Sequence, residues 1–282
     1  METRILDHEK VLSMLPDRDV KAHKGRFGRI LLLCGSMGYT GAAALTAMGA
    51  LRSGAGLVYL GVPACIYAIE AVKLTEPVVF PLPDRDGTLS ADAVVRVREM
   101  LPRMDAVLIG PGLGQSEGTL EVLRAVLREY PGTVVVDADG INLLAKHKDM
   151  VRGRDGVTIL TPHDGEFLRL GGSLEEDALE SVSRLAVDLG CIVVRKGHGT
   201  LVCDGTICYE NPTGNPGMAV GGSGDVLAGM IVGLLGQGIS PIEAAALAVW
   251  LHGAAGDRCA QEMGQYGMLP TDMLERLPRL MK

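Results

Sequence analysis

One short segment combines the residue types needed to bind an anion and to move a proton. Gly221-Gly222-Ser223-Gly224-Asp225 comes directly before an apolar segment with helical spacing. Backbone N–H groups at a helix N-terminus bind anions, and the helix dipole adds roughly half a positive charge there. We therefore predict an anion hole formed by Gly222, Ser223 and Gly224. Asp225 is the candidate catalytic base, because a carboxylate beside an anion hole can accept a hydroxyl proton during phosphoryl transfer. A simple helix N-cap is the plainer interpretation of Asp225.

Two other polar segments follow predicted strands. Lys196-Gly197-His198-Gly199-Thr200 offers an ammonium group and neighbouring N–H groups that suit a nucleotide phosphate, although Lys196 could also be only a solvated strand end. In Thr161-Pro162-His163-Asp164-Gly165-Glu166, either Thr161 or Asp164 could cap the next helix. His163 could bind a ligand and Glu166 could hold a magnesium-bound water, or the two could be a loop histidine and a capping glutamate. No direct metal-ligand motif is visible.

Several classes of protein are disfavoured by what the sequence lacks. It has no G-x-x-x-x-G-K-[ST] loop, no G-x-G-x-x-G fingerprint and no G-x-S-x-G motif. A net charge of −7 without a Lys/Arg-rich run argues against nucleic acid as a partner. No apolar stretch is long enough to span a membrane and the charged N-terminus shows no secretory signal, so we expect a cytoplasmic protein. The six cysteines include no C-x-x-C pair and are expected to be reduced thiols.

The positioning elements are short apolar segments that alternate with helical patterns. The expected strands are 29–34, 57–62, 78–81, 106–110, 133–137, 157–161 and 191–195, and the expected helices include 41–53, 91–101, 117–129 and 174–189. Mostly continuous apolar strands between helices indicate a parallel sheet covered on both faces. A hairpin is expected over 200–209, turning at Asp204-Gly205. The segment 224–235 has a helical apolar stripe, and Ser240 and Glu243 form a predicted capping box before the last long helix. No linker divides residues 1–282, which we interpret as one domain.

Glycine clusters follow three of the predicted strands, at 35–41, 110–114 and 197–199. The carboxyl ends of parallel strands line one crevice, where ligands of open α/β sheets bind. Loops without side chains let backbone N–H groups approach phosphates closely. The clusters together therefore predict a phosphate-binding crevice, whereas any single cluster could be only a tight turn.

The ordered set of motifs resembles the NAD(P)H-hydrate dehydratase family, a branch of the ribokinase-like superfamily. The resemblance begins near Gly25 and runs to the end of the chain. It rests on Gly38-Tyr39-Thr40-Gly41-Ala42-Ala43, Arg52-Ser53-Gly54-Ala55-Gly56-Leu57-Val58, Gly110-Pro111-Gly112-Leu113-Gly114, Val136-Asp137-Ala138-Asp139-Gly140-Ile141-Asn142, Thr161–Glu166, Lys196–Thr200, Asn215-Pro216-Gly217-Met218-Ala219, Gly221–Gly229 and His252-Gly253-Ala254-Ala255-Gly256-Asp257. Ser223 stands where Thr is common in the family, and Gly140 where Ala is common. The implied fold is α/β: a ribokinase-like three-layer α/β/α structure with a central, mostly parallel sheet.

The resemblance also implies a reaction and a set of site residues. The family dehydrates the S-form of NAD(P)H hydrate with ADP in bacterial-type members or ATP in eukaryotic ones, and with Mg²⁺, which makes it a carbon–oxygen lyase of cofactor repair. The expected contacts to the hydrated dinucleotide are Ala42, Gly112, Gly114, His163 and Asp225. The expected contacts to the adenine nucleotide are Lys196, Gly197, His198, Gly199, Thr200 and Gly224. Asn142 is a further expected crevice residue.

The resemblance further implies a homo-oligomer, a tetramer in many relatives, and a separate epimerase that acts on the same metabolite. Two other functions stay open at this point. A vitamin-pathway kinase of the same superfamily, of the hydroxymethylpyrimidine or hydroxyethylthiazole type, would share the Asp225 element and release a stable phosphorylated product. A non-catalytic nucleotide-binding regulator would bind ADP without turnover.

Overall fold

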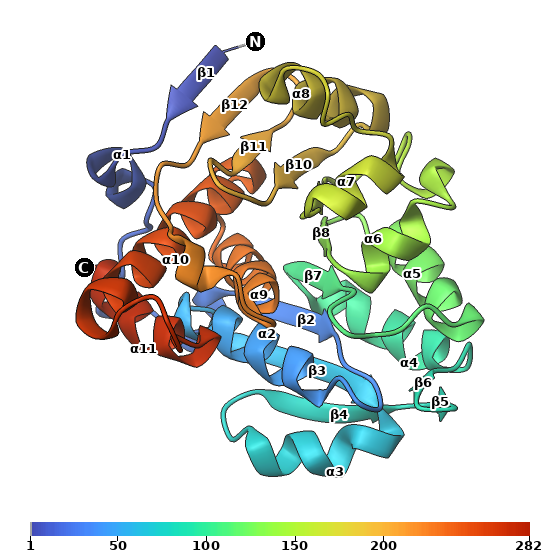
Figure 1. Cartoon of the computed structure of the whole chain (residues 1–282). Helices are drawn as coiled ribbons and strands as arrows, with labels where there is room; N and C mark the ends of the chain where they lie inside the picture. The colour runs from blue at the N-terminus through green and yellow to red at the C-terminus, as the bar shows by residue number, and fades with distance from the viewer. Residues whose placement is uncertain (1) are drawn as a thin grey trace.

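The computed structural model describes residues 2–282, which form an α/β structure around one large sheet (Figure 1). The strands are β1 (Glu2–Ile5), β2 (Arg29–Leu33), β3 (Leu57–Pro63), β4 (Val78–Leu82), β5 (Asp84–Arg85), β6 (Thr88–Leu89), β7 (Ala106–Ile109), β8 (Thr133–Val136), β9 (Thr158–Leu160), β10 (Ile192–Arg195), β11 (Leu201–Cys203) and β12 (Ile207–Glu210). The helices are α1 (His8–Ser13), α2 (Thr40–Arg52), α3 (Ala64–Lys73), α4 (Ala93–Met100), α5 (Glu117–Glu129), α6 (Asp139–Leu144), α7 (Asp164–Leu170), α8 (Ala178–Leu189), α9 (Ser223–Gly236), α10 (Pro241–Met263) and α11 (Pro270–Leu280).

Within residues 2–282 the main sheet has ten strands in the order β1-β12-β11-β10-β9-β8-β7-β2-β3-β4. Only the pairs that involve β11 are antiparallel, and β5 and β6 form a separate small hairpin. The chain starts the large parallel part at β2 and moves outwards to β3 and β4, then returns to β7 on the other side of β2 and continues towards β12. The prediction of a mostly parallel sheet is therefore confirmed.

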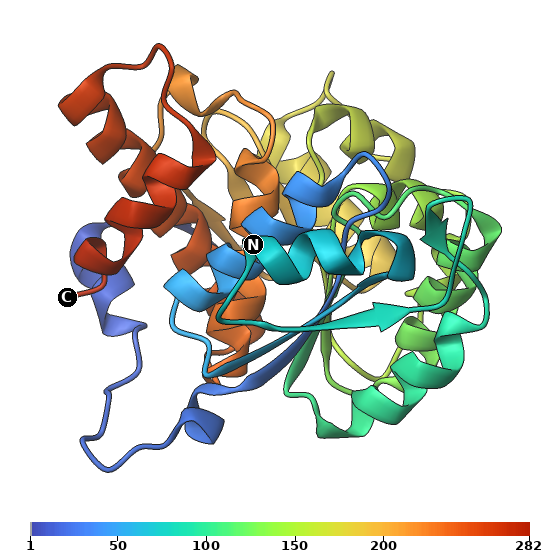
Figure 2. The ribbon, with the colours of Figure 1, turned by 90° about the horizontal axis from the view of Figure 1, so that it is seen from below.

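Two helix layers cover the sheet, as two views of the ribbon show (Figures 1 and 2). Along β2, Ile30 and Leu32 point into a core shared with α2, α9 and α10, whereas Leu31 and Leu33 point into a core shared with α4, α5 and α8. These four side chains are fully buried. Strands that bury both faces must be apolar at every position, which explains the continuous apolar segments of the sequence and confirms the predicted three-layer α/β/α arrangement.

Several element boundaries differ from the sequence prediction. Helix α8 begins at Ala178 rather than at 174, because the Asp177 carboxylate caps it by accepting a hydrogen bond from the Glu180 N–H at 3.1 Å. The capping box predicted at Ser240 does not form. Its hydroxyl donates instead to the Glu243 carboxylate at 2.5 Å, and no side-chain cap bond is made. Helix α9 begins at Ser223, so Asp225 lies in its first turn rather than before it.

The hairpin of β11 and β12 turns at Asp204-Gly205 as predicted. Cys203 and Cys208 occupy directly opposite positions of the two strands, with their Cα atoms 4.2 Å apart. The hairpin register, which spacing along the chain does not reveal, brings these two cysteines together, and their reduced state stays a prediction. Among residues 2–282, Cys34, Cys65, Cys191 and Cys259 are free.

Candidate active site

The crevice of the sheet lies where the chain reverses direction, between β2 and β7. The loops after these two strands are joined by hydrogen bonds: the Gly35 N–H donates to Pro111 O at 2.8 Å, and the Ser36 hydroxyl donates to Gly112 O at 2.7 Å. Gly112 has φ of +62°, and a Cβ there would lie 2.9 Å from the Ala42 Cβ. Two predicted dinucleotide contacts, Ala42 and Gly112, are therefore neighbours at the topological switch point, where ligands of open α/β sheets bind.

Gly114 belongs to the same loop and is tied to the next part of the sheet edge. Its φ is +74°, and its N–H donates to the Asp139 carboxylate at 2.9 Å. Asn142 lies on the same helix as Asp139 and is half-buried. Among residues 2–282, no hydrogen bond links the Asn142 side chain to the other candidate residues, and Asn142 lies one turn along the helix from the Asp139 that holds Gly114.

Helices α2 and α9 approach each other so closely that glycine is required at the contacts. A Cβ on Gly229 would lie 2.1 Å from Thr46 O, and a Cβ on Gly49 would lie 2.5 Å from Val226 O. Such distances are possible only without a side chain. As a result the predicted anion hole at the start of α9 lies beside the second turn of α2, where a Cβ on Gly222 would lie 2.4 Å from Leu45 Cδ1.

Three residues from the ends of three adjacent strands form a polar cluster, which we call the Asp137 cluster (Asp137, Thr161 and Lys196). The Lys196 ammonium donates to Asp137 Oδ1 at 2.8 Å, and the Thr161 hydroxyl donates to the same oxygen at 2.6 Å. Asp137 is 1% exposed and Thr161 is fully buried. A Cβ on Gly224 would lie 3.4 Å from Lys196 Nζ. The lysine thus lies between the buried carboxylate and the anion hole.

Asp225 faces this cluster from the first turn of α9. Burial and, to a lesser extent, the nearby negative charge of Asp137 raise the pKa of its carboxyl group to about 6, against the opposing effect of the Lys196 ammonium. Such a group is ionised at neutral pH and yet holds a proton more strongly than an ordinary aspartate. Both properties are required of a general base that acts near pH 7.

His163 and Glu166 form a capping box at the start of α7. The Nδ1 atom of His163 accepts hydrogen bonds from the N–H groups of Gly165 and Glu166 at 3.0 and 3.4 Å, and Glu166 Oε2 accepts from the His163 N–H at 2.9 Å. The prediction that Thr161 or Asp164 caps this helix is therefore wrong: the histidine ring takes that role. The His163 side chain is 57% exposed, so the rest of the ring is accessible to a ligand.

The loop after β10 is a tight turn closed on itself. The Thr200 hydroxyl donates to Gly197 O at 2.8 Å and accepts from the Gly197 N–H at 3.2 Å, and Gly199 has φ of +66°. Gly197 and His198 are exposed, and Thr200 is buried. This arrangement leaves the backbone of the turn facing solvent next to Lys196, as a nucleotide-binding loop requires.

Sequence reasoning gave no role to Asp137 or His252. The signal for Asp137 is its place at the carboxyl end of a buried strand. His252, on α10, is buried with its Nε2 atom 3.4 Å from the Ser223 hydroxyl, and burial lowers its pKa to about 4. The neutral imidazole packs directly behind the anion hole. A buried histidine in the middle of a helix carries no local sequence signal for such a contact.

The carboxylates of the crevice could help to bind Mg²⁺ only if the ion is also coordinated by the phosphates of a ligand. Residues 2–282 contain no group of three His, Cys, Asp or Glu side chains arranged to hold a metal ion. Glu166 is a buried carboxylate in the crevice region whose pKa is raised by burial, with Lys196 opposing the rise. One or two carboxylates together with phosphates and waters are the usual environment of Mg²⁺ at nucleotides. The donor set therefore fits an ion held mainly by nucleotide phosphates and water.

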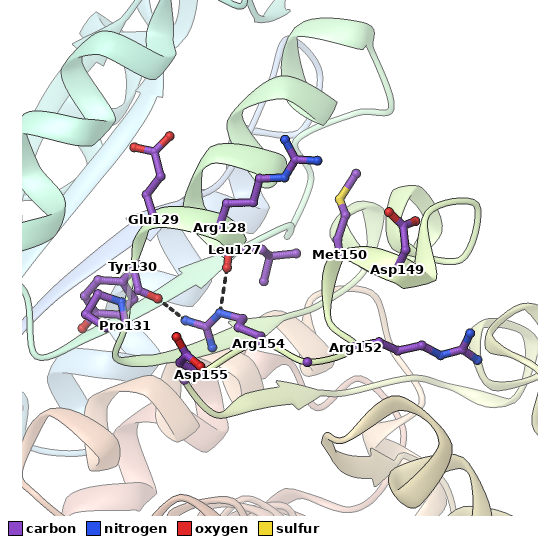
Figure 3. A pocket seen from close by; sticks show the side chains of 12 residues that line it. Leu127, Arg128, Glu129, Tyr130, Pro131, Asp149, Met150, Arg152, Arg154 and Asp155 are labelled. Carbon is purple, nitrogen blue, oxygen red and sulfur yellow. Dashed lines mark hydrogen bonds between the residues drawn. The ribbon is translucent and has the colours of Figure 1, made fainter.

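A cavity of about 480 Å³ lies at the opposite, amino-terminal edge of the sheet (Figure 3). It is lined by residues 127–131 and most of 149–156. The guanidinium group of Arg154 donates to Leu127 O at 2.9 Å, to Gly132 O at 2.7 Å and to Tyr130 O, so it joins the two loops that precede β8 and β9. None of the candidate residues lines this cavity.

No helix among residues 2–282 combines the length and apolar character needed to cross a bilayer.

Comparison with known proteins gives one consistent result. The model of the NAD(P)H-hydrate dehydratase family matches residues 30–279. The bifunctional NAD(P)H-hydrate repair enzyme Nnr of Moorella thermoacetica is 43% identical over 99% of this chain, and the match covers 54% of that protein. The chain spans about half the length of the curated relatives it matches.

Solved structures agree with this result. The ADP/ATP-dependent NAD(P)H-hydrate dehydratase of Bacillus subtilis, co-crystallised with ATP and Mg²⁺, is 32% identical with a TM-score of 0.83, and the match covers 97% of this chain and 96% of that one. A ribokinase-like superfamily protein of Enterococcus faecalis is 30% identical with a TM-score of 0.87, over 99% of this chain and 95% of that one. The predicted ribokinase-like fold is confirmed, and this chain belongs to the NAD(P)H-hydrate dehydratase family.

Proposed function

We propose that this chain, acting as one domain over residues 1–282, uses an adenine nucleotide to dehydrate the S-form of NAD(P)H hydrate to NAD(P)H. The observation that carries the proposal is the position of Asp225, in the first turn of α9 between the anion hole and the Asp137 cluster. A carboxylate with a raised pKa beside an anion hole is suited to a hydroxyl substrate and a phosphoryl donor. Membership of the dehydratase family supports the choice of substrate.

In the proposed reaction Asp225 takes the proton of the hydroxyl group that water has added to the nicotinamide ring. The hydroxyl oxygen then attacks the terminal phosphorus of the nucleotide, and the bond from that phosphorus to the bridging oxygen breaks. The N–H groups of Gly222, Ser223 and Gly224 and the Lys196 ammonium stabilise the transferred group. Phosphate is a far better leaving group than hydroxide, and the lone pair of the ring nitrogen expels it as the carbon–oxygen bond breaks. The iminium ion formed in this way then loses a proton from the neighbouring ring carbon to the departing phosphate or to water, which restores the ring double bond of NAD(P)H. The protein supplies position and charge for both steps.

Several finer points belong to the proposal. ADP is the expected phosphoryl donor and ATP the alternative. Mg²⁺ on the nucleotide phosphates, reached by Glu166 through water, would neutralise their charge. The Lys196–Thr200 turn would bind the nucleotide, and Ala42, Gly112, Gly114 and His163 would contact the dinucleotide. By resemblance we also propose a cytoplasmic homotetramer and an epimerase that acts on the same metabolite, which sedimentation and a coupled assay would test.

The direct test is to incubate the protein with hydrated NADH, magnesium and either ADP or ATP, and to follow the absorbance of reduced nicotinamide together with phosphate release. We expect NADH to return with one nucleotide at least, and Asp225→Asn to abolish the recovery. A stable phosphorylated product without free phosphate would instead support the vitamin-pathway kinase. Nucleotide binding without any turnover would support the non-catalytic regulator.

A further inference from the structure

Asp137 is the best-buried charged group of the crevice, and a single oxygen atom of its carboxylate receives both of its side-chain partners. The Lys196 ammonium and the Thr161 hydroxyl approach Oδ1 at 2.8 and 2.6 Å. The Asp137 side chain is 2% exposed, against 19% for Lys196. A buried carboxylate with an ammonium partner fixes the position of that partner, because separating the two charges would leave one of them uncompensated.

The backbone around Asp137 is fixed as firmly as its side chain. A Cβ on Gly110 would lie 1.8 Å from Asp137 O, so the main chain of β8 touches the loop after β7 with no room for a side chain. The next residue, Ala138, has φ of +49° and ψ of −116°, a conformation that residues with a Cβ rarely adopt. Strained backbone of this kind persists where the surrounding structure holds it and is concentrated at functional sites.

Lys196 depends on this carboxylate. Burial alone would lower the pKa of its ammonium group, but the charges of Asp137, Glu166 and Asp225 together raise it. Among these carboxylates only Asp137 is in direct contact with the ammonium, and a Cβ on Gly224 would lie 3.4 Å from the same ammonium. Without Asp137, the lysine would have no hydrogen-bonding partner that holds it beside the anion hole.

We propose that Asp137 is a positioning residue of the phosphate site: its carboxylate holds the Lys196 ammonium against the N-terminus of α9, where the ammonium meets the phosphoryl group of the nucleotide. This inference rests on the proposed nucleotide-dependent function. Asp137 itself does not touch the nucleotide and acts through Lys196.

The test is a double-mutant cycle that measures nucleotide affinity rather than turnover. ADP and ATP, each with magnesium, are titrated calorimetrically into the wild type, Asp137→Asn, Lys196→Met and the double variant. A charge-assisted hydrogen bond corresponds to an affinity change of about ten- to hundredfold. We expect Asp137→Asn and Lys196→Met each to weaken binding by about this factor, and the double variant to bind no more weakly than Lys196→Met alone.

Thr161→Val is the matched control, because it removes the other hydrogen bond of Asp137 and keeps the ion pair. We expect it to change affinity less than threefold or so, well below the loss in Asp137→Asn. Unchanged affinity in Asp137→Asn, or losses that multiply in the double variant, would overturn the inference. If Asp137→Asn alone does not fold, the double variant still decides the matter, since it removes both members of the Asp137–Lys196 ion pair and is compared with Lys196→Met.

The calorimetric cycle and the NADH-recovery assay together separate this inference from the proposed function. Coupled losses of nucleotide affinity in a protein that recovers no NADH would support the role of Asp137 and refute the dehydratase. NADH recovery by the wild type together with independent effects of the two substitutions would support the dehydratase and refute the role of Asp137. A wild type that binds neither nucleotide would overturn both.

Discussion

Replacing Asp225 by Asn should make the protein more stable while it abolishes activity. The pKa of the carboxyl group rises from 3.8 to about 6 on folding. The folded state therefore binds more protons than the unfolded state between these two values, so stability falls as pH rises through this window. A shift of about two units corresponds to roughly 3 kcal/mol, which the folded protein loses once the pH is above 6. Asparagine cannot ionise and does not incur this cost.

The difference should itself depend on pH. From the two pKa values, the variant should gain about 1 kcal/mol over the wild type at pH 4.5 and about 3 kcal/mol at pH 7.5. Urea unfolding of both proteins at these two pH values measures the difference directly. Equal stability at pH 7.5, or a gain that grows as the pH is lowered, would show that Asp225 is not held ionised in a desolvated site. Its assignment as the base would then lose its electrostatic support.

Three other predictions follow from the same geometry. Gly224→Ala should fold normally, because its Cβ would make only an ordinary contact, at 3.4 Å, with Lys196 Nζ. The same methyl group would occupy the space between the anion hole and the ammonium, where the phosphoryl group is proposed to bind, so kcat should fall by about tenfold to hundredfold. Gly221→Ala, whose Cβ meets nothing within 4 Å, should retain activity in the same assay. The pH profile of kcat/KM should fall on its acid side with a midpoint near the pKa of Asp225, about 6, and a flat profile down to pH 5 would contradict this. Thiol labelling of the native protein should modify the exposed Cys65 and spare the buried Cys34, because burial raises the pKa of the Cys34 thiol well above normal. Mass spectrometry of the labelled peptides measures this, and faster labelling of Cys34 than of Cys65 would contradict the prediction.

The sheet could be predicted closely because its strands bury both faces. Residues 30–33 are apolar without interruption, and such a segment fits only a central strand of a covered parallel sheet. Strand β1 could not be predicted in this way, since it lies at the edge beside β12 and is mostly exposed. Its pairing depends on residues about two hundred positions later, which no local pattern contains.

In the candidate site, too, local sequence patterns predict some of the residues and not others. The anion-hole segment at the start of α9 is contiguous and could be identified from its residue types alone. The Asp137 cluster could not, because its three members lie in three separate strands and become neighbours only through the strand order β8-β9-β10. Capping at His163 was also missed, because an imidazole ring is an unusual N-cap acceptor, whereas Thr161 and Asp164 beside it are the ordinary ones.

The glycines of α2 and α9 determine where the chemistry can occur. A helix that begins with an anion hole needs a partner surface that brings the substrate hydroxyl to the same place, and α2 begins beside the other predicted substrate contacts. Contact of the two helix backbones at Gly49 and Gly229 holds the start of α9 against α2 without any intervening side chain. Gly49 meets Val226, the residue after Asp225, so a larger residue there would push the first turn of α9 away from α2. The packing of the two helices therefore sets how far the proposed base lies from the substrate contacts at the start of α2.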